Sequence, residues 1–238
     1  MEISNLTVIG TSHISSDSVK NIKKAIKEKL PDIVAVELDK NRLYGLTHNQ
    51  KEKVDFSLIK RIGVSGFVFV MIGRYVQKKL AKVVNTKPGV DMLAAVHEAK
   101  ENNLMVALID QDIEVTLKRL SAKITFREKW NFFVDIIKGL LFPKRQIKQL
   151  GLESFDLTKV PEQELITKLL YSLKDRYPNI FLVLVHERNH YMANSLYSIM
   201  NTFPDKKVLA VVGAGHMNEM MDILEKKVNA QSKTSENI

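Results

Sequence analysis

The chain has 238 residues, of which 45% are hydrophobic and 26% are charged, so it can form one large domain or two small ones with a sizeable core. It contains no cysteine, which excludes disulfides and thiolate metal sites and leaves His, Asp, Glu and backbone oxygen as ligands for any metal. The first ten residues lack the basic start and long apolar run of a signal peptide, so we expect a cytoplasmic protein.

The formal net charge of +9 is concentrated in two segments. Residues 51–82 carry eight Lys or Arg against two Asp or Glu, and residues 118–148 carry nine against two. Two interpretations stay open: solvated helical faces, or an anionic partner. For the second, we expect a membrane surface rather than nucleic acid, because no stacking aromatics alternate with the basic residues.

Four short apolar runs predict buried strands, at Leu6–Ile9, Ile33–Leu38, Met105–Ile109 and Val208–Val212. Each run is rich in Val, Ile or Leu without clean alternation, which is typical of a parallel sheet covered on both faces. Helical patterns follow at Ser16–Leu30, Val90–Asn102, Ile113–Leu120 and Met217–Val228. The predicted fold class is therefore α/β, with a central, mainly parallel sheet of at least four strands flanked by helices.

Two helical insertions are expected within this single domain of residues 1–230, at about 51–84 and 124–200, and residues 231–238 are expected to form a flexible tail. Helical patterns cover Asp55–Val84 and Phe126–Leu141, and two more helices are expected over Pro161–Ser198, joined near Pro178. The apolar stretch 62–73 is too short to cross a bilayer, which needs roughly 20 residues.

One face of the 126–141 helix carries a wide apolar stripe that includes Trp130, Phe133, Ile137 and Leu140. Three explanations stay open: burial within the chain, self-association, and contact with an anionic bilayer. We expect a homodimer in which one or both insertions cross to the partner and help to roof the site described next.

Charged or imidazole side chains follow every predicted strand. In an open α/β sheet, ligands bind beyond the carboxyl ends of the strands, so these side chains are expected to converge. The first and last strands lead into the same Gly-x-x-His pattern, ending at His13 and His216. The second and third strands are followed by Glu37 with Asp39, and by Asp110 with Asp112.

Imidazole and carboxylate together suit a divalent metal ion, although the same groups could act as a general acid and base without metal. Two structural alternatives stay open. Glu37 could form a buried ion pair with Arg42 or Arg119, and Asp110 and Asp112 could cap the helix that begins at 113.

A second pattern, His186-Glu187-Arg188-Asn189-His190, matches the His-Glu-x-x-His spacing of zinc peptidases. We discount this interpretation because neither a third ligand nor a Met-turn is recognisable in the sequence.

The order of these motifs resembles that of the TraB/PrgY family over nearly the whole chain. The matching segments are Gly10-Thr11-Ser12-His13, Val36-Glu37-Leu38-Asp39 with Arg42, Lys87-Pro88-Gly89, Leu108-Ile109-Asp110-Gln111-Asp112, Thr116-Leu117-Lys118-Arg119, Glu187-Arg188, Tyr191-Met192-Ala193 and Val211-Val212-Gly213-Ala214-Gly215-His216. The family includes pheromone-shutdown proteins, is similar to the Tiki metalloproteases, and is distantly related to erythromycin-esterase-like and ChaN-like folds. Asp91, His186 and Asn189 depart from its usual pattern, which has Glu at the first position and acidic residues at the other two.

This resemblance implies an active site that contains His13, Glu37 and His216, with Glu187 and Arg188 near it. We therefore expect a metal-dependent hydrolase, acting on peptides, in which His13, Glu37 and His216 hold Mn, Co or Zn. The expected catalytic residues are Glu37, Glu187 as base or supporting group, and Arg188 as the oxyanion donor. The residues expected to contact a peptide or small-molecule substrate are Asp39, Arg42, Asp110, Asp112 and Arg119. The alternatives are a non-catalytic protein that sequesters such a ligand and a membrane-associated scaffold.

Overall fold

A computed structural model of the protein describes residues 2–11, 16–48, 56–84, 89–141 and 163–236. Its core is a five-stranded sheet in the order β1-β2-β5-β3-β4. The strands are β1 (Glu2–Ile3), β2 (Leu6–Thr11), β3 (Ile33–Val36), β4 (Met105–Leu108) and β5 (Val208–Gly213). Strands β2 to β5 are mutually parallel, and the short β1 is antiparallel to β2. The predicted α/β class, with its parallel sheet, is confirmed.

The last strand in sequence occupies the middle of the sheet. β5 pairs with β2 on one side and β3 on the other, and all six of its residues are buried. Its end at Gly213 lies opposite Thr11, the last residue of β2, and the Glu37 amide donates to the Val211 carbonyl. The insertion of β5 therefore brings segments from the two ends of the chain to one edge of the sheet.

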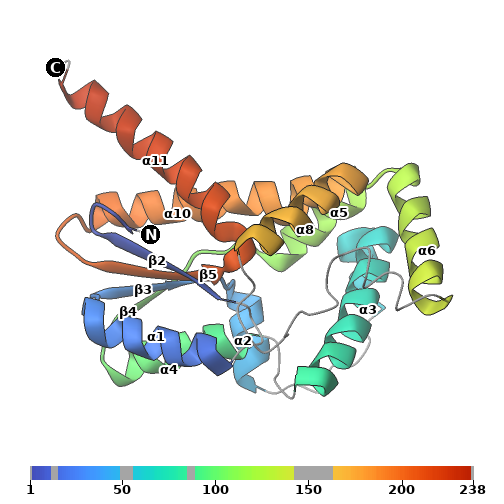
Figure 1. The fold of residues 1–238 in the computed structure, drawn as a ribbon, viewed down its shortest axis with the longest axis horizontal. Coiled ribbons are helices and arrows are strands. Elements are labelled where there is room, and N and C mark those ends of the chain that lie inside the picture. The colour runs from blue at the N-terminus through green and yellow to red at the C-terminus, as the bar shows by residue number, and fades with distance from the viewer. Residues whose placement is uncertain (1, 12–15, 49–55, 85–88, 142–162, 237–238) are drawn as a thin grey trace.

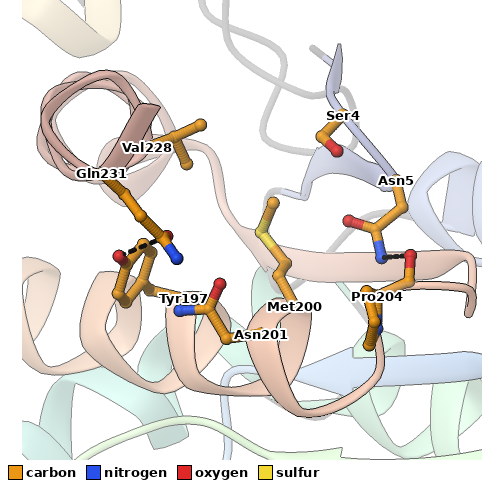
Figure 2. Close-up of a pocket in the computed structure, with 8 residues that line it drawn as sticks. All are labelled: Ser4, Asn5, Tyr197, Met200, Asn201, Pro204, Val228 and Gln231. Atoms are coloured by element: carbon orange, nitrogen blue, oxygen red, sulfur yellow. Dashed lines mark hydrogen bonds between the residues drawn. The ribbon is translucent and has the colours of Figure 1, made fainter. Parts of the chain in front are cut away.

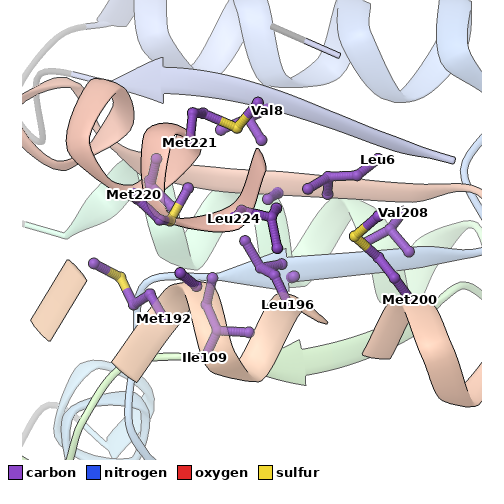
Figure 3. Packing of buried hydrophobic residues seen from close by; sticks show 14 of the residues in the cluster. Leu6, Val8, Ile109, Met192, Leu196, Met200, Val208, Met220, Met221 and Leu224 are labelled. Carbon is purple, nitrogen blue, oxygen red and sulfur yellow. The ribbon is translucent and has the colours of Figure 1, made fainter. Parts of the chain in front are cut away.

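Helices cover both faces of the sheet (Figure 1). One face packs against α1 (Ser16–Lys29) and α4 (Val90–Glu101), and the other against α10 (Glu187–Thr202) and α11 (Ala214–Glu236). Side chains of β3 alternate between the two cores, since Ile33 and Ala35 belong to one cluster and Val34 and Val36 to the other. Figure 3 shows the α10–α11 side, where methionines from both helices fill the space above the strands.

The helices agree with the sequence pattern at most ends. α1 ends at Lys29, where Leu30 adopts a positive φ of 47° and Pro31 follows. α5 (Ile113–Lys123) and α6 (Phe126–Leu141) begin where predicted, and a helix break near Pro178 separates α8 (Gln163–Arg176) from α9 (Pro178–Phe181). α11 extends to Glu236, into the segment predicted to be a flexible tail.

Sequence reasoning missed two short elements and one irregular turn. β1 and α2 (Lys40–His48) are short, and α2 contains no buried residue, so neither leaves a clear hydrophobic period. The irregular turn is a π-helix, η1 (Leu182–His186), which leads directly into α10. Turns of this kind are frequent at functional sites.

Of the segments predicted as insertions, residues 58–84 and 126–141 lie beyond the carboxyl ends of the strands, to the right in Figure 1, whereas α10 packs on the sheet. α3 (Leu58–Val84) packs along α5, with a break at Gly63, where φ is 76°. α6 is tied to the remainder of the domain by Phe132, which stacks on Phe69 of α3 and meets Tyr177 edge-on. Glu128, which is buried, accepts hydrogen bonds from the backbone of Thr125, Asn179 and Ile180.

The apolar stripe of α6 is only partly covered. Trp130 is 56% exposed, Phe133 53% and Ile137 38%. Burial within the chain therefore accounts for Phe132 but not for these three side chains. None of the helices within the described ranges is long and apolar enough to cross a membrane.

The homodimer stays a prediction, and the exposed stripe provides its test. Light scattering across a dilution series should give a dimer mass at micromolar concentration, because large exposed apolar patches usually mark interaction sites. Trp130→Glu together with Phe133→Glu should convert the protein to monomer.

Leu30→Asn is the matched control, because it removes a 71% exposed apolar side chain elsewhere and suits the positive φ at that position. A monomer mass for the unmodified protein would contradict the homodimer.

Candidate functional site at the carboxyl ends of the strands

The residues that follow three of the parallel strands meet around one arginine. Arg188, in the first turn of α10, reaches Glu37 after β3, Asp110 after β4 and His216 after β5. Of the side chains predicted to converge at the strand ends, the structure brings Glu37, Asp110 and His216 together around Arg188. His13 lies outside the described residues.

Arg188 uses all five of its N–H groups within the protein. Nε donates to Asp110 Oδ1 at 2.9 Å, and Nη2 donates to Asp110 Oδ2 at 2.7 Å and to Glu37 Oε1 at 2.5 Å. Nη1 donates to the Leu184 carbonyl and to His216 Nε2, both at 3.1 Å. A guanidinium has five donors, so none is left over in this arrangement.

The charge of Arg188 is firmly held. Burial alone would lower its pKa, but the nearby carboxylates of Glu37 and Asp110 outweigh that effect and raise the pKa above its ordinary value. The side chain is 15% exposed, and its two carboxylate partners are 2% and 1% exposed. Because pairing replaces hydration for these groups, removing one partner would leave a buried charge uncompensated.

Glu37 is fixed through both of its carboxylate oxygens. Oε2 accepts from the Gly213 amide at 2.6 Å, and Oε1 accepts from Arg188 and lies 3.4 Å from His216 Nε2. The buried ion pair considered for Glu37 from the sequence thus exists, but its partner is Arg188. Arg42 pairs with Asp110 at 2.6 Å, and Arg119 pairs with Glu187.

His216 stands in the first turn of α11, directly after the central strand. Its side chain is 12% exposed. Nδ1 lies 2.6 Å from Asn189 Oδ1, and Nε2 faces Arg188 and Glu37. The Gly-Ala-Gly stretch before it lets β5 pass into α11 without an intervening loop, so the imidazole lies at the sheet edge.

Of the other acidic residues near the strand ends, Asp112 and Asp39 cap helices, whereas Asp110 pairs with arginines of the site. Asp112 caps α5 by accepting from the Glu114 amide, as one interpretation of the sequence expected, while Asp110 contacts Arg188 and Arg42. Asp39 caps α2 through Oδ1, which accepts from the amides of Asn41 and Arg42.

Among the described residues, the buried oxygens without a hydrogen-bond partner include Asp39 Oδ2 and Thr11 Oγ1, both near this edge. Burial raises the pKa of Asp39 above its ordinary value, although the amides of Arg42 and Asn41 oppose the shift. A buried carboxylate oxygen without a donor is costly, and such groups are concentrated at functional sites.

Glu187 and the histidine pair occupy the outer side of the same helix. Glu187 accepts two hydrogen bonds from Arg119, at 2.5 and 2.6 Å, which lowers its pKa. The rings of His186 and His190 meet edge-on, 4.6 Å apart, and His186 Nδ1 contacts Glu219. Within the described part of the chain, no group of three or more His, Asp or Glu side chains is placed to hold a metal ion.

No role in the site was assigned from the sequence to two residues, Asn189 and Glu219. Asn189 is fully buried and lies between His216 and Glu219, with its Nδ2 2.5 Å from Glu219 Oε2. A usable signal did exist, because Asn189 follows Arg188 directly and Glu219 lies three residues after His216, on the same helical face.

A separate hollow of about 490 Å³ lies at the opposite end of the strands. Figure 2 shows it between α10, α11 and the turn after β1, lined by Asn5, Tyr197, Met200, Gln231 and their neighbours. Of the described residues that line it, none carries a formal charge. The chemistry-bearing residues therefore lie at the carboxyl edge and not in this hollow.

Comparison with known proteins agrees with the order of motifs. The model of the TraB/PrgY/gumN family matches residues 2–229. An uncharacterized protein of Methanocaldococcus jannaschii is 33% identical over 94% of the chain and 54% of its own length. TraB domain-containing proteins of human and mouse are each 26% identical over 90% of the chain and 61% of their own length. The chain thus spans little more than half the length of these relatives.

Arg188 should be the most sensitive position of the site for stability. Arg188→Met leaves Glu37 and Asp110 buried without their main counter-charge, so we expect the free energy of unfolding to fall by about 3–5 kcal/mol. Arg119→Met removes a 47% exposed partner and should cost less than about 1 kcal/mol. Urea denaturation measures both values. Equal losses would contradict the central role of Arg188.

The shifted pKa values of Asp39 and Glu187 predict opposite pH effects. The pKa of Asp39 is raised, so its ionised form costs stability at pH values above the ordinary pKa of 3.8. The stability of wild type relative to Asp39→Asn should therefore increase as the pH falls from about 7 towards about 4. The lowered pKa of Glu187 contributes stability that is present above its ordinary value of 4.5, so wild type should keep its advantage over Glu187→Gln down to about pH 5 and lose it as the pH falls further, towards about 3. Unfolding curves at several pH values test the two signs.

Proposed function

The chain belongs to the TraB/PrgY/gumN family, and from the chemistry of its strand-end site we propose that it is a metal-dependent hydrolase acting on peptides. The observation that carries this proposal is the pairing of Glu37 and His216. Oε1 of Glu37 and Nε2 of His216 face one another at 3.4 Å. Two ligands of a tetrahedral ion, each about 2.1 Å from it, lie roughly this far apart.

The surroundings of both atoms also fit metal ligands. The second oxygen of Glu37 is held by the Gly213 amide, and Nδ1 of His216 is held by Asn189. Ligating side chains are usually oriented by such outer contacts, which fix the ring and raise the basicity of the ligand atom. His13, the third expected ligand, follows Thr11, whose buried Oγ1 has no partner.

The charge balance at this edge favours a cation. Among the described residues, six carboxylates, from Glu37, Asp39, Asp110, Asp112, Glu187 and Glu219, lie at or beside this edge with three guanidiniums, from Arg42, Arg119 and Arg188, and with Lys123 near Glu187. This surplus is acidic in a chain whose net charge is +9. A site for a phosphate or another polyanion would have the opposite balance.

Arg188 would change its role when a cation binds. Its Nη1 and Nη2 groups now donate to the two proposed ligand atoms, while Asp110 accepts from Nε and Nη2. Loss of the contacts to Glu37 and His216 would free one N–H on each terminal nitrogen. Asp110 would keep the guanidinium in place, so these two donors could stabilise an oxyanion.

The other residues would supply orientation and proton transfer. A divalent ion bound at this edge would activate water and polarise the carbonyl group of the substrate. Glu187 is the candidate base or supporting group, and its pairing with Arg119 keeps it ionised. Asp39, Arg42 and Asp112 line the same edge, where they could contact the polar backbone of a peptide.

The second candidate function is sequestration of a peptide or small ligand without turnover. It is favoured by one feature, the complete use of the Arg188 donors inside the protein. If those contacts persist, no donor is available for a transition state. The basic insertions and the exposed stripe of α6 would then be the surface for a partner or an anionic membrane.

Metal binding is the first test. Calorimetric titration of the metal-free protein with Mn²⁺, Co²⁺ or Zn²⁺ should give one site, and Glu37→Gln or His216→Ala should weaken it at least about tenfold. His97→Ala is the control, because His97 is exposed on α4. Tight binding that survives His216→Ala would contradict the proposed site.

Turnover is the second test. The metal-loaded protein should cleave members of a fluorogenic peptide library, and His13→Ala and His216→Ala should each abolish cleavage while melting close to wild type. A metal-loaded protein that binds a peptide tightly and never cleaves it would favour sequestration instead.

A further inference from the structure

The hydrogen bonds around Asn189 determine which nitrogen of His216 carries a proton. Glu219 presents two carboxylate oxygens, which can only accept hydrogen bonds when ionised. Its Oε2 lies 2.5 Å from Asn189, so the group of Asn189 that faces it must be the NH₂. The amide oxygen of Asn189 must then face His216 Nδ1, at 2.6 Å. Because that oxygen accepts, Nδ1 must be protonated.

The other side of the ring leads to the same assignment. Nε2 of His216 lies 3.1 Å from Arg188 Nη1, which can only donate. Glu37 Oε1 could accept from a protonated Nε2, but it lies farther away, at 3.4 Å. The neutral form of His216 with its proton on Nδ1 and a lone pair on Nε2 therefore fits the contacts with both Asn189 Oδ1 and Arg188 Nη1.

The packing of two helices holds this arrangement. Asn189 lies on α10, and His216 and Glu219 lie one turn apart on α11, along one of the most extensive helix contacts of the domain. Asn189 is 0% exposed, so its amide has little access to water as an alternative partner. Glu219 is 34% exposed, and its other oxygen contacts His186 Nδ1 at 2.5 Å. The chain of contacts thus runs from the surface to the buried site.

We propose that Asn189 and Glu219 are positioning residues that hold His216 as the Nδ1–H tautomer and so leave a lone pair on Nε2, the atom that faces Arg188 and Glu37. The assignment of the tautomer is independent of metal binding. Its consequence for ligand affinity rests on the proposed function, since only a bare Nε2 can coordinate an ion. An amide alone could present either end to the ring, and the carboxylate of Glu219 removes that ambiguity.

Nitrogen-15 NMR of the metal-free, histidine-labelled protein at about pH 8, where free imidazoles are neutral, tests the assignment directly. The signals of His216, identified by their loss in His216→Ala, should show a protonated Nδ1 and a bare Nε2. A wild-type His216 with its proton on Nε2 would overturn the proposal.

Two substitutions of Glu219 test whether its hydrogen bonds, and not only its packing, set the tautomer of His216. In Glu219→Gln the new amide has one accepting and one donating group, so it can still accept from Asn189 if its NH₂ faces His186. We expect this variant to leave the His216 tautomer unchanged and to move the proton of His186 from Nδ1 to Nε2. Glu219→Met cannot accept, so the Asn189 amide becomes free to rotate and the His216 signals should become a mixture of tautomers. A pure Nδ1–H signal for His216 in Glu219→Met would overturn the proposed role of Glu219.

Metal affinity gives an independent measurement. We expect Glu219→Met and Asn189→Leu to weaken binding of Zn²⁺ by about 10–100-fold, and Glu219→Gln to retain it. If wild type has the Nδ1–H tautomer and yet binds no divalent ion, the positioning roles stand and the proposed metal site fails. If Zn²⁺ binds equally well to Glu219→Met and wild type, Glu219 has no positioning role for the ligand.

Discussion

A buried guanidinium is stable only where each of its N–H groups meets an acceptor, and this constraint organises the strand ends of the protein. Arg188 meets it with acceptors from four separate segments: Glu37, Asp110, Leu184 and His216. Each acceptor must be delivered to within hydrogen-bond distance, which ties the ends of β3, β4 and β5 to the first turns of α10. The same contacts give the buried carboxylates of Glu37 and Asp110 a counter-charge in a site that is almost closed to water.

The order of the sheet makes this convergence possible. Because β5 pairs with β2 and β3, the last strand of the chain lies between the first two parallel strands, and His216 follows it next to Glu37. Residues from near both ends of the chain therefore become neighbours without any long loop. The π-helical turn at 182–186 adds to this arrangement, since the Leu184 carbonyl within it accepts from the Arg188 side chain.

Sequence reasoning found the sheet and the strand-end residues because their signals are local. The runs 33–36 and 208–212 are continuously apolar, and a polar residue directly after such a run must lie at a sheet edge. The partner of Glu37 was harder to predict: the ion pair considered as an alternative for it named Arg42 or Arg119, whereas Glu37 pairs with Arg188, 151 residues away. Asn189 and Glu219 carry no motif of their own. Their roles arise only when α10 packs on α11, which a single sequence does not encode in any short pattern.

The His-Glu-x-x-His spacing illustrates why a local match can mislead. His186 and His190 do share a helical face, as the i, i+4 rule requires, and their rings are in contact. That face lies towards Glu219 and the solvent, however, whereas the next residues along the helix, Arg188 and Asn189, face the strand ends. The turn at the start of α10 therefore has contacts on two sides. His186, directly before α10, contacts Oε1 of Glu219, and the side-chain amide of Asn189 contacts Oε2. The segment with the spacing of a zinc peptidase motif therefore contacts His216 through Asn189, and contacts Glu219 through both His186 and Asn189.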